Sequence, residues 1–204
     1  MIVLMNGFLF YWMSWLLWVI VTFFLNKSKL RTILACWLLI IIFTSNTYVS
    51  IDNYTLLLGY VIFFLGVIFI HTLLPRPFYH LFVSFTIMIG YTSILLWKDG
   101  SSLSLFIPEL IFIPIFSSFL ILLLTTKLYS RVITGVLGMS TAELLYGFII
   151  TEYQVNITIG NLAFFDILFT TITLLFFIDR IQYGLLKSYA RLATYKQTVT
   201  WQNE

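Results

Sequence analysis

Charged residues are scarce in this sequence. Only 9% of its 204 residues are Asp, Glu, Lys or Arg, whereas 61% are hydrophobic. Because a water-soluble domain carries about 25% charged residues, this composition excludes a soluble core. A membrane-spanning helix needs about 20 apolar residues, so the chain has room for up to seven or eight spans with short loops and for no further soluble domain.

Motifs for catalysis and cofactor binding are also missing. The sequence contains no GxSxG elbow, HExxH motif, P-loop or GxGxxG loop. The single cysteine, Cys36, rules out an internal disulfide, and we expect it to be a buried small filler. We therefore predict a protein that is not an enzyme, with no catalytic residue, no cofactor and no metal site.

The two histidines, His71 and His80, flank the sequence Pro75-Arg76-Pro77. Nine residues and two prolines apart, they have no metal-ligand spacing. We expect them to pack or to form hydrogen bonds at the membrane interface. A contact with a lipid headgroup beside Arg76 is the alternative interpretation.

Apolar stretches separated by polar or basic connections predict an all-α bundle of about seven transmembrane helices. The predicted spans are Gly7–Leu25, Thr32–Thr47, Tyr54–Leu74, Phe78–Trp97, Leu103–Thr126, Val132–Ile150 and Gly160–Ile178. Together they form a transmembrane domain over residues 1–178. The second span is the weakest, because polar residues occupy its outer end.

The basic residues predict the orientation of the bundle. With seven spans, only Lys98 of the 11 basic residues lies on the outer side. The others share one side: Lys27, Lys29, Arg31, Arg76, Lys127, Arg131, Arg180, Lys187, Arg191 and Lys196. Because basic residues in short loops mark the cytoplasm, we predict a multi-pass plasma-membrane protein with its N-terminus outside and its C-terminus inside.

Residues 179–204 predict a cytoplasmic tail that contains a basic amphipathic helix. Basic residues recur on one helical face, at Arg180, Lys187 and Arg191. Apolar residues recur on roughly the opposite face, at Ile181, Leu185, Tyr189 and Leu192. This pattern is typical of a helix that binds the anionic lipids of the inner leaflet. Lys196 breaks the pattern, so we expect the helix to end near Tyr195.

The sixth span combines small residues with an acid. At about 100° per residue, Gly135, Gly138 and Ala142 lie on one narrow stripe, which favours close approach of another helix. Glu143 lies about a quarter turn away, so we expect it to face the same interior. A charge at mid-membrane costs roughly 2.5–3.5 kcal/mol on insertion scales, so this carboxylate needs a specific role.

Two further acids, Glu109 and Asp166, are predicted to lie about two turns from the outer ends of their spans. With Glu143, and with Asn161 and Ser140 nearby, they form a candidate polar pocket that would bind a cation or relay protons. Alternatively, each carboxyl is protonated or hydrogen-bonded to a neighbouring helix and fixes helix register. Simple exposure at the outer interface is a third interpretation for Glu109 and Asp166.

The opening GFLFYWMSWLLWVIVTFFLNKSKLR, residues 7–31, resembles that of the YphA family. These are small multi-span membrane proteins of endospore-forming Gram-positive bacteria. The chain length and the basic first cytoplasmic loop are similar too. The resemblance implies a protein of the plasma or forespore membrane that takes part in sporulation, in spore envelope assembly. It supplies no enzymatic residues.

Two functions therefore remain open. The first is a non-enzymatic membrane assembly or scaffold protein, which favours a membrane-protein partner or a second copy of this chain. The second is a small transporter or ion-coupled carrier that uses Glu143, Glu109 and Asp166. The lack of an obvious internal repeat counts against the carrier. The lipid bilayer is a partner in both cases, and nucleic acid is not expected, because membrane topology and the tail account for the basic residues.

The predicted orientation can be tested at the C-terminus. A reporter that is active only in the cytoplasm, fused after Glu204, should be active, because seven spans and an external N-terminus place this residue inside the cell. The measurement is reporter activity in cells that express the fusion stably. An inactive fusion of normal abundance would disprove the predicted number of spans.

Overall fold

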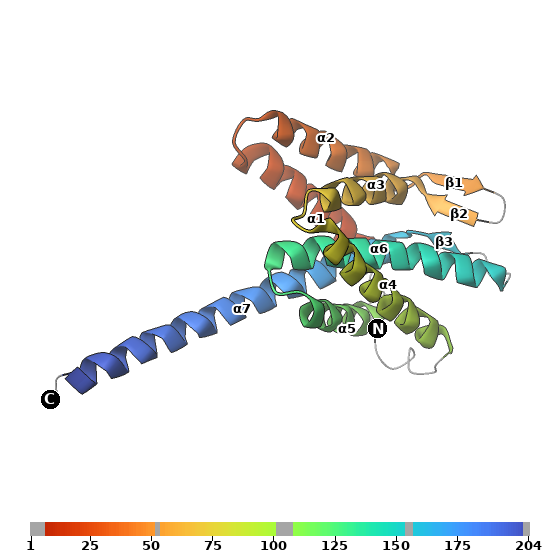
Figure 1. Ribbon diagram of the computed structural model, residues 1–204. Coiled ribbons are helices and arrows are strands. Elements are labelled where there is room, and N and C mark those ends of the chain that lie inside the picture. Colours follow the sequence, from red (N-terminus) through yellow and green to blue (C-terminus); the bar gives the residue numbers. More distant parts are fainter. Residues whose placement is uncertain (1–6, 52–53, 101–107, 154–156, 202–204) are drawn as a thin grey trace.

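The computed structural model is a bundle of helices with a small sheet at one end (Figure 1). It describes residues 7–51, 54–100, 108–153 and 157–201, and for Asp99, Leu186 and residues 188–201 the backbone alone. The helices are α1 (Phe8–Val19), which continues as the π-helix η1 (Ile20–Phe24), α2 (Lys29–Thr44), α3 (Leu58–Thr72), α4 (Pro77–Gly100), α5 (Glu109–Leu124), α6 (Leu128–Glu152) and α7 (Leu162–Trp201). Each predicted span overlaps one of these helices, but α2, α4, α6 and α7 extend beyond the predicted bounds.

The helices differ in their capacity to cross a bilayer. Three segments within the described residues are long and apolar enough to do so: Pro77–Lys98, Leu128–Glu152 and Leu162–Leu185. Phe8–Phe24, Leu58–Thr72 and Glu109–Leu124 are shorter apolar helices. The structure therefore supports an integral membrane protein. Helix α2 belongs to neither group in this part of the chain, and it coincides with the span predicted to be weakest.

The small sheet is a departure from the all-α prediction. Strands β1 (Tyr48–Ile51) and β2 (Tyr54–Leu57) form an antiparallel pair, and β3 (Thr158–Ile159) lies parallel to β2. The third predicted span was therefore wrong at its start, because helix α3 begins at Leu58 and not at Tyr54. Open sheet edges do not occur in contact with hydrocarbon, so the sheet marks one end of the membrane-embedded region.

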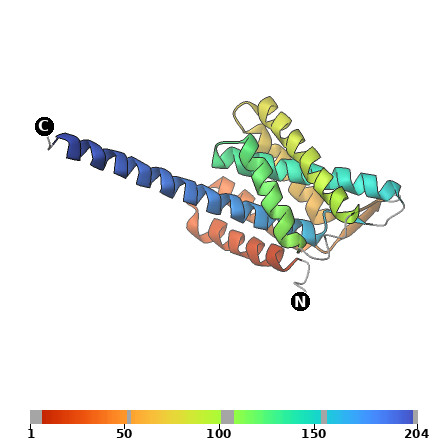
Figure 2. The same ribbon diagram turned by 90° about the horizontal axis from the view of Figure 1, so that it is seen from below.

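Helix α7 leaves the bundle at the end opposite the sheet (Figures 1 and 2). It passes residue 178 and the predicted helix end near Tyr195 without a break and ends at Trp201. At 1.5 Å per residue its 40 residues measure about 60 Å, roughly twice the thickness of the hydrocarbon core. Of the residues that define its predicted faces, Arg180, Ile181, Leu185 and Lys187 are exposed. The side chains of Tyr189, Arg191, Leu192 and Lys196 lie outside the described part.

Helix α6 occupies the centre of the bundle and contacts α3, α4, α5 and α7. Its stripe of Gly135, Gly138 and Ala142 is buried, as the small side chains predict. Neighbouring helices donate hydrogen bonds to its backbone carbonyls, namely Ser84 Oγ to Thr134 O at 3.1 Å, Tyr60 Oη to Ser140 O at 2.5 Å and Thr92 Oγ1 to Ala142 O at 3.4 Å. Small residues and interhelical hydrogen bonds are the usual means of helix association where lipid provides no hydrophobic force.

Helix α2 packs on α3 through Trp37, whose indole covers Gly66 and would collide with any side chain there. A Cβ atom at Gly59 would lie 3.1 Å from the backbone oxygen of Ile41 in α2, so both glycines of α3 serve close packing against α2. Cys36 is exposed on α2, and its prediction as a buried filler was wrong. Indole packing turns the Trp37 face of α2 inward and leaves Cys36 on its outer surface.

The packing of α4 on α6 depends on Gly138. A Cβ atom there would lie 2.7 Å from Ile87 Cβ and 2.8 Å from the backbone oxygen of Ser84. We expect Gly138→Ala to lower the free energy of unfolding by about 1–3 kcal/mol, the usual cost of overpacking. Thermal unfolding of the purified protein in detergent measures this effect.

Gly184→Ala provides the matched control, because a Cβ atom at Gly184 meets nothing within 4 Å. Alanine has the higher helix propensity, so this variant should be as stable as the wild type or slightly more stable. Equal unfolding temperatures for the two variants would contradict the role given to close α4–α6 contact.

Candidate functional site

A polar cavity of about 120 Å³ lies near the sheet end of the bundle, among α4, α5, α6, β3 and the start of α7. Its polar lining includes Glu109, Glu143, Lys98, Tyr91, Thr158 and Asn161. The structure thus brings two of the three predicted acids, and the predicted Asn161, to one cavity. A space of this size accommodates a few water molecules or one hydrated cation.

Glu143 is buried in the bundle, with 8% of its surface exposed. Its Oε1 atom accepts a hydrogen bond from the backbone N–H of Gly160 at 3.4 Å. Gly160 has a φ of 71°, and the ring of Tyr60 occupies the place of a side chain there, so only glycine fits. The carboxylate therefore holds the turn between β3 and α7.

Glu109 is the first residue of α5. The prediction that it lies about two turns inside a helical span was wrong. The preceding part of that predicted span, from Leu103 to residue 107, lies outside the described residues. Glu109 Oε2 forms an ion pair with Lys98 Nζ at 3.2 Å, and half of the glutamate side chain is exposed. An exposed pair of this kind contributes roughly 0–1 kcal/mol.

Sequence reasoning missed Lys98, which it treated only as the one basic residue of the outer side. The structure places its side chain in the cavity lining with Glu109 and Glu143. A cation between two acids reduces their mutual repulsion. The available signal was the position of Lys98 and Glu109 at opposite ends of one short connection.

Asp166 lies apart from this cavity and serves the start of α1. Its Oδ2 accepts a hydrogen bond from Gly7 N and its Oδ1 from Phe10 N, both at 2.7 Å. The first N–H groups of a helix have no partner within that helix, and Gly7 offers no side chain to satisfy them. Asp166 lies about one turn into α7, not two, and its partners are 159 and 156 residues away in the sequence.

The cap that Asp166 provides can be tested by substitution. Asp166→Ala should lower the free energy of unfolding by about 0.5–2 kcal/mol, because it leaves two buried N–H groups unpaired. Asp166→Asn retains one oxygen acceptor, so its free energy of unfolding should fall by less. Thermal unfolding in detergent measures both variants, and an alanine variant as stable as the wild type would contradict the cap.

Within the described residues, the hydroxyl of Ser140 forms no hydrogen bond. The hydroxyl of Tyr91, which lines the cavity, forms none there either. Ser140 lies on the α3-facing part of α6, where its carbonyl, and not its side chain, bonds to Tyr60. The predicted polar constellation is therefore divided between a cavity, a helix cap and a helix contact.

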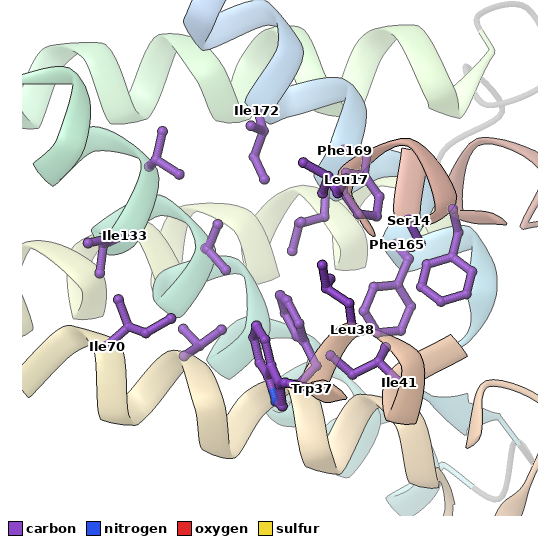
Figure 3. Close-up of a pocket in the computed structure, with 16 residues that line it drawn as sticks. Ser14, Leu17, Trp37, Leu38, Ile41, Ile70, Ile133, Phe165, Phe169 and Ile172 are labelled. Atoms are coloured by element: carbon purple, nitrogen blue, oxygen red, sulfur yellow. The ribbon is translucent and has the colours of Figure 1, made fainter. Parts of the chain in front are cut away.

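An apolar cavity of about 220 Å³ separates α1 and α2 from α6 (Figure 3). Residues from five helices face it, among them Ser14, Trp37, Ile70, Ile133 and Phe165. The described residues that line it include no acid, base or thiol. This cavity therefore offers room for hydrocarbon and no group for acid–base or nucleophilic chemistry.

Comparison with known proteins places the chain in a family. The model of the family described as YphA-like integral membrane protein matches residues 6–201. The chain is also 26% identical over 190 residues to a Bacillus subtilis (strain 168) protein named uncharacterized protein YphA, covering 88% of this chain and 90% of that protein. No solved structure matches it significantly. The chain therefore belongs to the YphA-like integral membrane protein family.

Proposed function

We propose that this protein is a non-enzymatic membrane scaffold. In this proposal the bundle is fixed in the plasma membrane, N-terminus outside and C-terminus inside, and presents the end of α7 to a cytoplasmic partner. One observation carries the choice: each membrane acid has its own partner within the chain. Asp166 binds the start of α1, Glu143 binds Gly160 and Glu109 binds Lys98. Acids engaged in this way stabilise helix ends and turns.

The base of α7 is anchored where the helix leaves the bundle. Arg131 is buried, and its Nε donates a hydrogen bond to Thr125 O at 3.0 Å. A terminal nitrogen of the same guanidinium donates to Gln182 Oε1 at 3.3 Å and lies 3.7 Å from Asp179 Oδ1. One side chain thus links the end of α5 and the start of α6 to α7. An anchored helix suits the display of a binding surface.

The surface of α7 beyond this anchor has two kinds of group to offer a partner. Arg180 and Lys187 are exposed and basic, while Tyr183 and Leu185 are exposed and apolar. A helix with both properties suits the anionic inner leaflet or a groove on a partner protein. The partner in this proposal is another membrane-associated protein or a second copy of this chain.

A carrier is the second candidate, because Glu109, Glu143 and Lys98 line one cavity. Buried acids that share a cavity with a cation are typical of proton and ion relays in membranes. In this alternative, Glu143 would exchange a proton or cation with the outer side of the membrane.

The spore-envelope role comes from the family resemblance of the opening residues 7–31. We propose that the protein acts in the plasma or forespore membrane during sporulation. The direct test is the number of heat-resistant spores formed by a host strain that lacks this gene.

Two variants distinguish the scaffold from the carrier. Truncation after Leu185 removes most of the projecting part of α7. It should reduce spore formation to the level of the deletion strain. The proteins that copurify with the intact chain should no longer copurify with the truncated one. Glu143→Gln keeps an oxygen acceptor for Gly160 N and should restore spore formation fully.

Immunoblots of the membrane fraction provide the control, because both variants must be as abundant as the wild type. An inactive Glu143→Gln variant with normal copurifying proteins would support the carrier. A fully active truncation would contradict the scaffold.

A further inference from the structure

A larger polar cavity, of about 430 Å³, lies at the end of the bundle from which α7 leaves. It forms where the α3–α4 connection meets the α5–α6 connection. Its polar lining consists of Arg76, Tyr79, His80, Thr125, Thr126, Lys127 and Ser130, and it includes no acid among the residues that the structure describes. The cavity thus combines two permanent cations with four hydroxyl groups and an imidazole.

The charges of Arg76 and Lys127 are not neutralised within the described residues. The ion pairs found there join Lys98 to Glu109 and Arg131 to Asp179. Both cationic side chains are exposed at the cavity. The site therefore carries a net positive charge that an anion can balance.

Two helices begin at this cavity, and both add to its positive potential. Helix α4 starts at Pro77, after Arg76, and α6 starts at Leu128, after Lys127. The N-cap residue Lys127 makes no side-chain cap for α6. The first N–H groups of long helices lack intrahelical acceptors and carry the positive end of the helix dipole, which favours bound phosphate.

His80 supplies an independent observation. It lines the cavity, only 9% of its surface is exposed, and its Nδ1 atom has no hydrogen-bond partner within the described residues. Buried polar side-chain atoms in proteins are nearly always paired. An imidazole nitrogen left unpaired at a cationic cavity points to a ligand that supplies the missing partner.

The backbone at Arg76 is also unusual. Its φ of 61° is uncommon for a residue other than glycine, and the following proline favours an extended conformation instead. Glycine or asparagine would adopt this φ at lower cost. Strained positions of this kind cluster at ligand sites. We therefore infer that an arginine occupies this position because its guanidinium binds a ligand.

We propose that this cavity binds the phosphate group of an anionic phospholipid. Arginine binds phosphate through two parallel hydrogen bonds, and lysine adds a mobile charge. Phe78, Phe82 and Leu123 continue from the cavity along α4 and α5, and they are exposed by 86%, 70% and 68%. This apolar surface gives the acyl chains a place beside the headgroup site. The proposal does not depend on the scaffold function.

The test uses the full-length protein in phosphatidylcholine nanodiscs that contain increasing fractions of phosphatidylglycerol. The temperature of thermal unfolding should rise with the fraction of phosphatidylglycerol, because a ligand that binds only the folded state stabilises it. Lys127→Gln should weaken the apparent affinity by about tenfold, as expected for one charge-assisted contact. Arg76→Asn should do the same, because asparagine tolerates the positive φ.

The matched control is the double variant Lys27→Gln and Lys29→Gln, which removes exposed charges from the same side of the bundle but outside the cavity. It should keep the wild-type response to phosphatidylglycerol. The unfolding temperature of the Lys127→Gln variant in pure phosphatidylcholine must equal that of the wild type, which shows that the fold is intact. An equal loss in the control would mean general surface attraction and would overturn the site.

Inorganic phosphate distinguishes the two sources of the same chemical group. Millimolar phosphate added to the protein in pure phosphatidylcholine should stabilise it little, because free phosphate lacks the acyl chains that bind beside the cavity. The lipid would be overturned as the ligand if inorganic phosphate alone raised the unfolding temperature as much as phosphatidylglycerol does, and phosphatidylglycerol then raised it no further.

Discussion

Close approach of helix backbones at α6 is the constraint on which the rest of the bundle depends. Lipid provides no hydrophobic force between helices, so contact area and interhelical hydrogen bonds must hold them together. Gly138 lets α4 approach until the backbone of Ser84 nearly touches α6. At that distance Ser84 and Thr92 reach α6 carbonyls, while Tyr60 does so from α3. Helices α3, α5 and α7 also contact α6, so this helix is the common neighbour of much of the bundle.

The buried acids belong to the same design. A transmembrane helix satisfies its own backbone except at its ends, and Gly7 and Gly160 lie beside two such ends, those of α1 and α7. Asp166 accepts hydrogen bonds from the first, and Glu143 from the second. Asp166 therefore joins α7 to a segment 159 residues away, while Glu143 joins α6 to the turn 17 residues further along the chain. This structural use of acids explains their presence in an apolar chain without requiring transport.

The two ends of the bundle have different chemistry. The sheet end carries a small cavity lined by two acids and one lysine, which pairs with Glu109. The opposite end carries the larger basic cavity, the Arg131 anchor and the projecting part of α7. If both proposals hold, phospholipid headgroups bound at this cavity would lie beside the base of α7, at the end of the bundle from which that helix projects. The apolar cavity between these ends adds hydrocarbon-like space and no charge.

The sequence by itself determined the membrane class, the helical stretches and the small-residue face of α6, because these depend on composition and local periodicity. It also predicted that Glu143 and Asn161 would lie near one another. The Lys98–Glu109 pair spans only 11 residues, so the sequence held a signal for it that was missed. Only the tertiary structure decided that Asp166 caps α1 and that β2 pairs with β3. These depend on contacts between segments up to 159 residues apart, which no local pattern encodes. The sequence suggested a headgroup contact beside Arg76 as one alternative, but not the contribution of Lys127. Arg76 and Lys127 meet only because the α3–α4 and α5–α6 connections pack side by side.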